Sequence, residues 1–176
     1  SIFAATNIFY SIYFDFFIGL NSYVLTFLLS FILGSLFSFI GRNNKKDIIL
    51  TDQIIFALLG FLLAPCLIAL PYYLSIYDLD LLNSYFESVS GFTATGFSII
   101  TDINNIDAPL ILWRSSSQWL GGLFFLIITI GTIGSKQIKI KPSYLISGGA
   151  SGRNFYNNFN SNFLKILFIY FITTIL

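Results

Sequence analysis

The sequence predicts an all-α integral membrane protein in which spanning helices flank a shorter helix and an irregular loop. Of the 176 residues, 56% are hydrophobic and only 10% are charged, whereas soluble domains carry about 25% charged residues. The apolar residues gather in runs of about 20, the length that crosses a bilayer as a helix. A Gly- and Thr-rich loop lies between two of these runs, where irregular backbone is tolerated only inside protein or along a water-filled path.

The chain contains no His and a single Cys, Cys66, which lies inside an apolar run. A disulfide framework is therefore excluded, and a His/Cys metal site is not expected. We expect Cys66 to act as a small apolar side chain. The net charge of +1 does not indicate nucleic-acid binding, because the basic residues lie in short loops rather than on one face.

Both ends of the sequence indicate a piece of a longer protein. The chain begins at Ser1, contains no Met, and ends at Leu176 inside an apolar run that starts near Phe163. A helix of about 14 residues rises about 21 Å, less than the roughly 30 Å of a hydrocarbon core. We therefore expect residues 163–176 to be the start of a truncated span.

Residues 1–41 are interpreted as a leading pair of transmembrane helices. The apolar block 2–13 is too short to cross a membrane, and we expect it to be the end of a truncated span. Polar residues and a glycine within 15–21 mark a turn, and residues 23–40 form a nearly uninterrupted apolar run. Residues 42–53 are then predicted to form a basic loop.

Residues 54–134 are interpreted as one helix–pore loop–helix repeat. The first span, 54–76, contains an apolar run of about 21 residues, which rises about 31 Å as a helix. Pro65 and Pro71 lie within this span and predict a kink. The last span of the repeat is predicted over residues 109–134.

Between these two spans the sequence predicts a short helix over residues 79–90, capped by Asp78 or Asp80. Its apolar part is about 15 Å long, roughly half of a membrane. It is too short to span and too apolar for an ordinary exposed loop, so a re-entrant helix is the better interpretation. Residues 91–98 follow as the irregular loop.

The placement of charge predicts the orientation in the membrane. The connection 77–107 holds five acidic residues and no basic one, whereas the loops 42–53 and 135–162 are basic. The basic residues of the two loops are Arg42, Lys45, Lys46, Lys136, Lys139, Lys141 and Arg153. Under the positive-inside rule both basic loops are cytoplasmic, and the 91–98 loop faces outward.

The stretch from Ser90 to Ser98 reads Ser-Gly-Phe-Thr-Ala-Thr-Gly-Phe-Ser. A helix that enters the membrane with its C-terminal end places about half a negative charge there, and backbone carbonyls can replace the hydration shell of a monovalent cation. The carbonyls expected to do so belong to Thr93, Ala94, Thr95 and Gly96. Gly96 suits a backbone conformation closed to residues with a Cβ. The alternative is a Gly/Ser-rich turn without a ligand.

Residues on either side of this loop are expected to support it. Glu87 either lines the ion path or, in the preferred interpretation, accepts hydrogen bonds from the loop backbone, as a buried acid near irregular backbone often must. Ser90 and Gly91 are expected to hold the start of the loop. Arg114 is interpreted as an interfacial anchor or a structural partner rather than an ion gate.

Two motifs with this spacing resemble a known family. They are Phe86-Glu87-Ser88-Val89-Ser90-Gly91-Phe92-Thr93-Ala94-Thr95-Gly96 and, further along, Leu112-Trp113-Arg114 with Gln118-Trp119-Leu120-Gly121-Gly122. They are similar to the first pore repeat of Trk/Ktr/HKT-type potassium uptake proteins, especially the TrkH/TrkG branch. In that family four helix–pore loop–helix repeats surround one pore, and TrkH-type members add two leading helices.

The resemblance implies that this chain is part of a potassium uptake subunit and holds the end of the leading pair, the first repeat and the start of the second. It implies that residues 93–96 form one quarter of a selectivity filter for K⁺, which is the substrate; no cofactor is expected. Structural or interface roles are implied for Arg114, Gln118, Trp119, Gly121 and Gly122.

The resemblance also implies the partners and the location. The partners are the lipid bilayer, a second copy of the full-length subunit, and a cytoplasmic nucleotide-binding regulatory subunit of the TrkA/KtrA type that docks on the basic loops. The expected location is the bacterial inner membrane.

Other functions are compatible with parts of the sequence. Transport of Na⁺, or of both Na⁺ and K⁺, keeps the same fold, because Gly96 favours potassium only weakly. An intramembrane enzyme needs paired acids, a nucleophile system or a metal site. The chain has no His, and among its acids only Glu87 lies near the spans, so no enzyme is expected. A structural membrane anchor would explain the spans but not the half-length helix and its loop.

Overall fold

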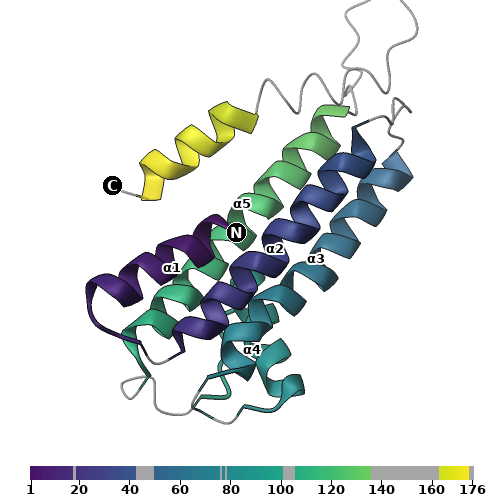
Figure 1. Cartoon of the computed structure of the whole chain (residues 1–176). Coiled ribbons are helices and arrows are strands. Elements are labelled where there is room, and N and C mark those ends of the chain that lie inside the picture. Colours follow the sequence, from purple (N-terminus) through teal and green to yellow (C-terminus); the bar gives the residue numbers. More distant parts are fainter. Residues whose placement is uncertain are drawn as a thin grey trace, which may run out of the picture. The chain divides into compact units, whose positions relative to one another are not determined.

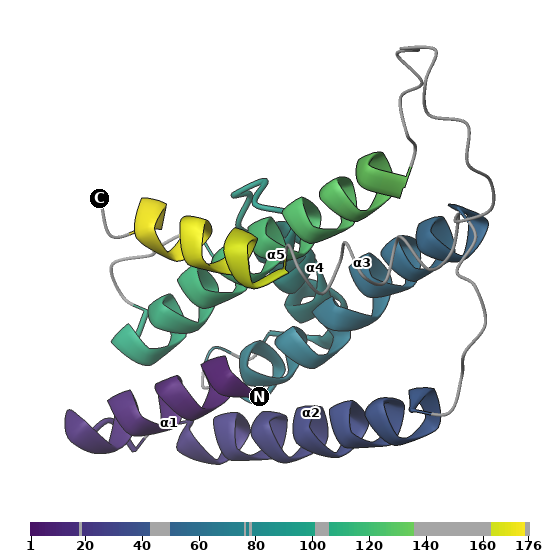
Figure 2. The same ribbon diagram turned by 90° about the horizontal axis from the view of Figure 1, so that it is seen from above.

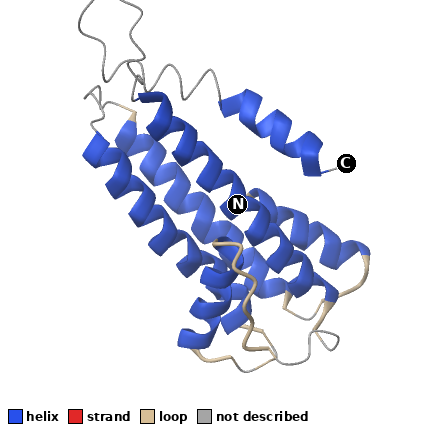
Figure 3. Cartoon of the chain, turned by 180° about the vertical axis from the view of Figure 1, so that it is seen from behind, coloured by secondary structure: helices blue, strands red, loops and turns tan. Residues whose placement is uncertain are grey.

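A computed structural model describes residues 1–17, 19–42, 50–75, 77, 79–100, 106–135 and 163–174, and every regular element in this part of the chain is a helix (Figure 3). The helices are α1 (Ile2–Tyr13), α2 (Leu20–Gly41), α3 (Leu50–Tyr73), α4 (Leu81–Phe92), α5 (Ala108–Ser135) and an unlabelled helix Phe163–Thr174 (Figure 1). The all-α prediction is confirmed for these residues. The lysines of both basic loops and Arg153 lie outside the described residues. Residues 50–53, predicted to belong to the first basic loop, are instead the first turn of α3, so that loop boundary was wrong.

Two helices in the described part are long and apolar enough to cross a membrane. They are α2, with 22 residues and a mean hydropathy of 2.2, and residues Thr51–Tyr73 of α3, with a mean hydropathy of 2.6. A helix of 22 residues rises about 33 Å. α5 has 28 residues, which suffices in length. α1 and α4 have 12 residues each, about 18 Å at the same rise.

The helices divide into two compact units, Ser1–Asn44 with Leu59–Gly122, and Lys45–Leu58 with Leu123–Leu176. The first unit holds α1, α2, most of α3, all of α4 and the first half of α5. In the second unit the rings of Phe56 and Phe124 lie 6.3 Å apart, centroid to centroid. The predicted loop and its supporting residues all belong to the first unit.

α1 and α2 form a helical hairpin in the first unit (Figure 2). The predicted turn between them contains two left-handed residues, Asp15 with φ of 57° and Gly19 with φ of 80°. The buried residues of the two helices are mostly small or polar: Ala4, Asn7 and Ser11 on α1, and Ser22, Tyr23 and Thr26 on α2. Small residues allow close approach of helices in a membrane, where no hydrophobic force drives them together.

α3 continues as one helix through Pro65 and Pro71, and both prolines are buried. A proline inside a helix removes one backbone hydrogen bond and displaces the carbonyls of the preceding turn. In each case a side chain from another helix binds the carbonyl three residues before the proline. The Tyr85 hydroxyl donates to the Leu62 carbonyl at 3.1 Å, and Trp113 Nε1 donates to the Ile68 carbonyl at 3.0 Å. These two hydrogen bonds connect α4 and α5 to α3 in the turns that precede the prolines.

α4 begins where the sequence predicts a cap. The Asp80 side chain accepts a hydrogen bond from the Asn83 backbone at 2.9 Å, which satisfies one of the free N–H groups of the first turn. The helix extends through Phe92, two residues beyond the predicted end at residue 90. Gly91 and Phe92, expected in the loop, therefore belong to the last turn of the helix.

Candidate ion-binding loop after α4

The chain leaves α4 through a Schellman motif. The Thr95 N–H donates to the Ser90 carbonyl at 3.1 Å, and the Ala94 N–H donates to the Gly91 carbonyl at 3.0 Å, the two bonds that define this helix ending. Ala94 occupies its left-handed position, with φ of 55°, where glycine is the usual residue. The motif turns the chain sharply, so residues 93–98, here named the carbonyl loop, begin directly at the C-terminal end of α4.

Three successive carbonyls of the carbonyl loop have no hydrogen-bond partner in the described part of the chain. They belong to Thr93, Ala94 and Thr95, and these residues are exposed. Gly96 is also exposed and has φ of 81°, in the left-handed region that L-residues rarely adopt. The C-terminal end of a helix carries a partial negative charge of about half a unit. The site is therefore rich in unpaired acceptors and negative in potential, which favours a cation.

Hydroxyl groups fix the shape of the carbonyl loop from within. Ser90 Oγ donates to the Phe97 carbonyl at 2.6 Å, and Thr95 Oγ1 donates to Ser90 Oγ at 3.2 Å. Thr93 Oγ1 donates to the Val89 carbonyl at 2.8 Å. Ser90, in the last turn of α4, therefore ties the two ends of the loop together.

A buried ion pair lies beside the end of the carbonyl loop. Glu87 is fully buried, and its Oε2 lies 2.8 Å from Nη1 of Arg114, whose side chain is 15% exposed. Glu87 Oε1 accepts hydrogen bonds from Ser98 Oγ at 2.8 Å and from the Ile99 backbone. The carboxylate thus contacts the last residue of the carbonyl loop and the residue that follows it.

Arg114 is the second member of this pair and also contacts the loop itself. It donates to the Phe97 carbonyl at 3.0 Å and to Ser98 Oγ at 2.9 Å. It also donates to the Gly96 carbonyl at 3.5 Å. A guanidinium presents several donors in a rigid fork, so one side chain holds three successive residues of the loop. Since Glu87 balances its charge, the pair adds no net charge beside the unpaired carbonyls.

The start of the carbonyl loop is held against α5 by close packing rather than by hydrogen bonds. A Cβ added to Gly121 would overlap with the Phe92 carbonyl group, and one added to Gly91 would lie 2.5 Å from Ser117 Oγ. The end of α4 therefore sits directly on the α5 backbone. Ser117 was not among the predicted residues, although its four-residue spacing to Gly121 is the small-xxx-small pattern of close membrane helix pairs.

The remaining predicted residues, Gln118, Trp119 and Gly122, also lie on α5. The Trp119 ring packs against Phe3 of α1, with centroids 5.4 Å apart. Gln118 and Gly122 are half-buried. Phe97 and Ser98, which receive the hydrogen bonds of Arg114, were missed as partners because the sequence alone does not say which loop residues a helix 16 residues away will reach.

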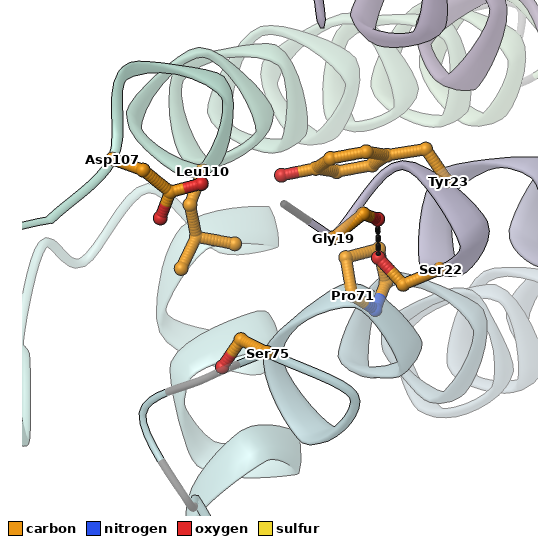
Figure 4. Close-up of a pocket in the computed structure, with 7 residues that line it drawn as sticks. All are labelled: Gly19, Ser22, Tyr23, Pro71, Ser75, Asp107 and Leu110. Atoms are coloured by element: carbon orange, nitrogen blue, oxygen red, sulfur yellow. Dashed lines mark hydrogen bonds between the residues drawn. The ribbon is translucent and has the colours of Figure 1, made fainter. Parts of the chain in front are cut away.

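A separate small cavity lies between the start of α2, the end of α3 and the start of α5 (Figure 4). Its volume of about 10 Å³ is close to the minimum that holds one water molecule. It is lined by Gly19, Ser22, Tyr23, Pro71, Ser75, Asp107 and Leu110. No residue of the carbonyl loop lines it, so it is not part of the candidate site.

Next to this cavity, Tyr77 and Asp107 connect the chain before α4 to the start of α5. The Tyr77 hydroxyl donates to Asp107 Oδ1 at 2.9 Å and accepts from the Asp107 backbone N–H at 2.7 Å. Burial, the larger cause, and the neighbouring carboxylate together raise the pKa of Tyr77 above its ordinary value of 10.0. The hydroxyl therefore stays protonated and keeps donating at neutral pH.

Two long apolar helices, in a described part of the chain whose regular elements are all helices, indicate a helical membrane protein. Comparison with known proteins confirms the resemblance noted from the motifs. Over 134 residues the chain is 28% identical to an uncharacterized cation transporter of Methanocaldococcus jannaschii, covering 68% of this chain and 28% of that protein. Together with the two long apolar helices, these similarities support a membrane location.

Two further relatives are Trk system potassium uptake proteins. TrkI of Halomonas elongata is 40% identical over 65 residues, which cover 37% of this chain and 13% of TrkI. TrkH of Escherichia coli K12 is 22% identical over 114 residues, which cover 64% of this chain and 24% of TrkH. The chain thus spans about a quarter or less of the length of the curated relatives it matches. No family model matches the chain, and no solved structure gives a significant match.

Proposed function

We propose that this chain is part of a membrane protein that takes up monovalent cations, with K⁺ as substrate, and that the carbonyl loop supplies one of four similar walls of its selectivity filter. The observation that carries the proposal is the row of unpartnered carbonyls from Thr93 to Thr95 at the C-terminal end of a half-length helix. The similarity to potassium uptake proteins supports the choice of ion.

The chemistry of the loop suits an ion of single charge. Neutral carbonyl oxygens replace water around a cation without adding formal charge. The partial charge at the end of α4 attracts the cation, and the Glu87–Arg114 pair is neutral as a unit. In this proposal Glu87 supports the backbone from outside the ion path, and Arg114 fixes the residues that close the loop.

The re-entrant placement of α4 and the orientation belong to the same proposal. α4 enters from the outer side, so the carbonyl loop faces outward and both basic loops face the cytoplasm of a bacterial cell. The complete protein forms a dimer and binds a nucleotide-binding regulatory subunit on its cytoplasmic side. Lipid contacts the apolar faces of α2 and α3.

The test is potassium uptake by the complete gene product in a bacterial strain that lacks its own uptake systems. Gly96→Ala and Gly34→Ala each add one methyl group where nothing lies within 4 Å, and only Gly96 has a left-handed φ. We expect Gly96→Ala to reduce uptake strongly, because an alanine costs about 1–2 kcal/mol in that conformation. Gly34→Ala should transport normally.

Three outcomes count against the proposal. Absence of potassium uptake by the wild-type protein, at a normal level in the membrane, contradicts potassium transport. Uptake of Na⁺ in preference to K⁺ supports the sodium alternative. Equal uptake by Gly96→Ala and Gly34→Ala removes the carbonyl loop from the ion path.

A further inference from the structure

One face of α5 contacts both ends of the carbonyl loop. Arg114, Ser117 and Gly121 are spaced by three and four residues, so they lie on the same side of the helix. Arg114 holds the end of the loop through the Phe97 carbonyl. Ser117 and Gly121 face Gly91 and Phe92, which immediately precede the loop. A single face of α5 therefore determines where the carbonyl loop lies.

The contact at Gly121 is one that no other residue can make. The obstacle to a Cβ at this position is the backbone carbonyl group of Phe92, which cannot rotate away as a side chain could. Any side chain at residue 121 must push the end of α4 away from α5. Because Phe92 is bonded to Thr93, that displacement reaches the first of the unpaired carbonyls directly.

The contact at Gly91 is of a different kind. A Cβ at Gly91 would meet Ser117 Oγ at 2.5 Å but Ser117 Cβ at an ordinary 3.7 Å. Here the obstacle is one hydroxyl, which donates to the Arg114 carbonyl at 2.7 Å. Replacing Ser117 with alanine removes the obstacle and leaves the α5 backbone unchanged. We therefore expect Gly91→Ala and Gly121→Ala to differ in their effects, although each adds one methyl group.

We propose that Gly121 is a selectivity-determining position, which sets the position of the carbonyl loop by letting the Phe92 carbonyl pack directly on the α5 backbone. At the neighbouring contact, Ser117 Oγ leaves no room for a Cβ at Gly91. The inference rests on the proposed function and adds a residue outside the carbonyl loop that determines ion selectivity. Selectivity depends on the positions of the coordinating oxygens, so a displaced loop changes which ion is preferred.

The experiment measures the ratio of K⁺ to Na⁺ uptake by the complete gene product in the uptake-deficient strain. For Gly121→Ala we expect the ratio to fall about tenfold, the change that about 1.4 kcal/mol of lost discrimination produces. Gly34→Ala is the matched control, because its added Cβ meets nothing within 4 Å, and it should keep the wild-type ratio. A wild-type ratio in Gly121→Ala overturns the inference.

A second set of variants tests the inference if Gly121→Ala fails to reach the membrane. Gly91→Ala should lower the ratio by less than Gly121→Ala, because a hydroxyl yields more easily than a backbone. Gly91→Ala with Ser117→Ala should restore it, and Ser117→Ala alone should stay near wild type. If Ser117→Ala does not improve Gly91→Ala, the inference is wrong. Lack of potassium uptake by the wild-type protein contradicts instead the proposed function, so the two failures are distinguishable.

Discussion

Arg114 and Glu87 form an ion pair across 27 residues of sequence, with 2.8 Å between Nη1 and Oε2. The pair joins α5 to α4, and both members also bind the chain at the end of the carbonyl loop. Glu87 is fully buried, and Arg114 is its ion-pair partner. The geometry of the loop and the stability of the helix pair therefore rest on the same contact.

The first prediction concerns this ion pair. Arg114→Gln leaves a buried carboxylate without its partner, and we expect a loss of about 3–5 kcal/mol in the free energy of unfolding. Glu87→Gln should cost less, because Arg114 keeps some contact with solvent. The double variant should lose less than the sum of the two single losses. Thermal unfolding in detergent measures all three, and strictly additive losses would show that the side chains are not coupled.

The second prediction concerns the left-handed alanine that ends α4. Ala94 with φ of 55° carries a strain of about 1–2 kcal/mol that glycine does not have, and glycine loses about 0.5–1 kcal/mol in chain entropy. We expect Ala94→Gly to raise the free energy of unfolding by up to about 1 kcal/mol. Ala64→Gly, inside α3, should lower it by about 1 kcal/mol. A loss of stability in Ala94→Gly would contradict the left-handed assignment.

The sequence predicted the helices well and their contacts poorly. Runs of apolar residues define where α2 and α3 lie, and Asp80 is a cap that local chemistry identifies. The end of α4 was placed two residues early because it depends on Ala94 accepting a conformation that alanine normally avoids. The pairing of Glu87 with Arg114 depends on the rotation of α5 against α4. Hydropathy does not specify that rotation in a helix that is apolar over most of its surface.

The third prediction concerns the fastening of α5 to α3. Trp113→Phe removes the donor to the Ile68 carbonyl, in the turn that Pro71 opens. A hydrogen bond contributes about 0.5–1.5 kcal/mol net, and we expect a loss of that size in the free energy of unfolding, measured by thermal unfolding. Tyr73→Phe, at an exposed position of α3, is the control and should unfold as wild type. Equal stability of the two variants would mean that Trp113 contributes no hydrogen bond.

The last prediction concerns the hydroxyl of Tyr77. Tyr77→Phe removes two hydrogen bonds at once, and we expect a loss of about 1–3 kcal/mol. Asp107→Asn keeps the backbone donor and an acceptor oxygen, so its loss should be smaller. The pKa of Tyr77 is raised in the folded protein. The contribution of its hydroxyl to the free energy of unfolding is therefore fully present below pH 10.0, the ordinary pKa, and is lost as the pH rises through the higher pKa of the folded protein. The wild-type protein should therefore lose its stability advantage over Tyr77→Phe only above about pH 10. A difference that fades between pH 7 and pH 9 would contradict this role of the phenol.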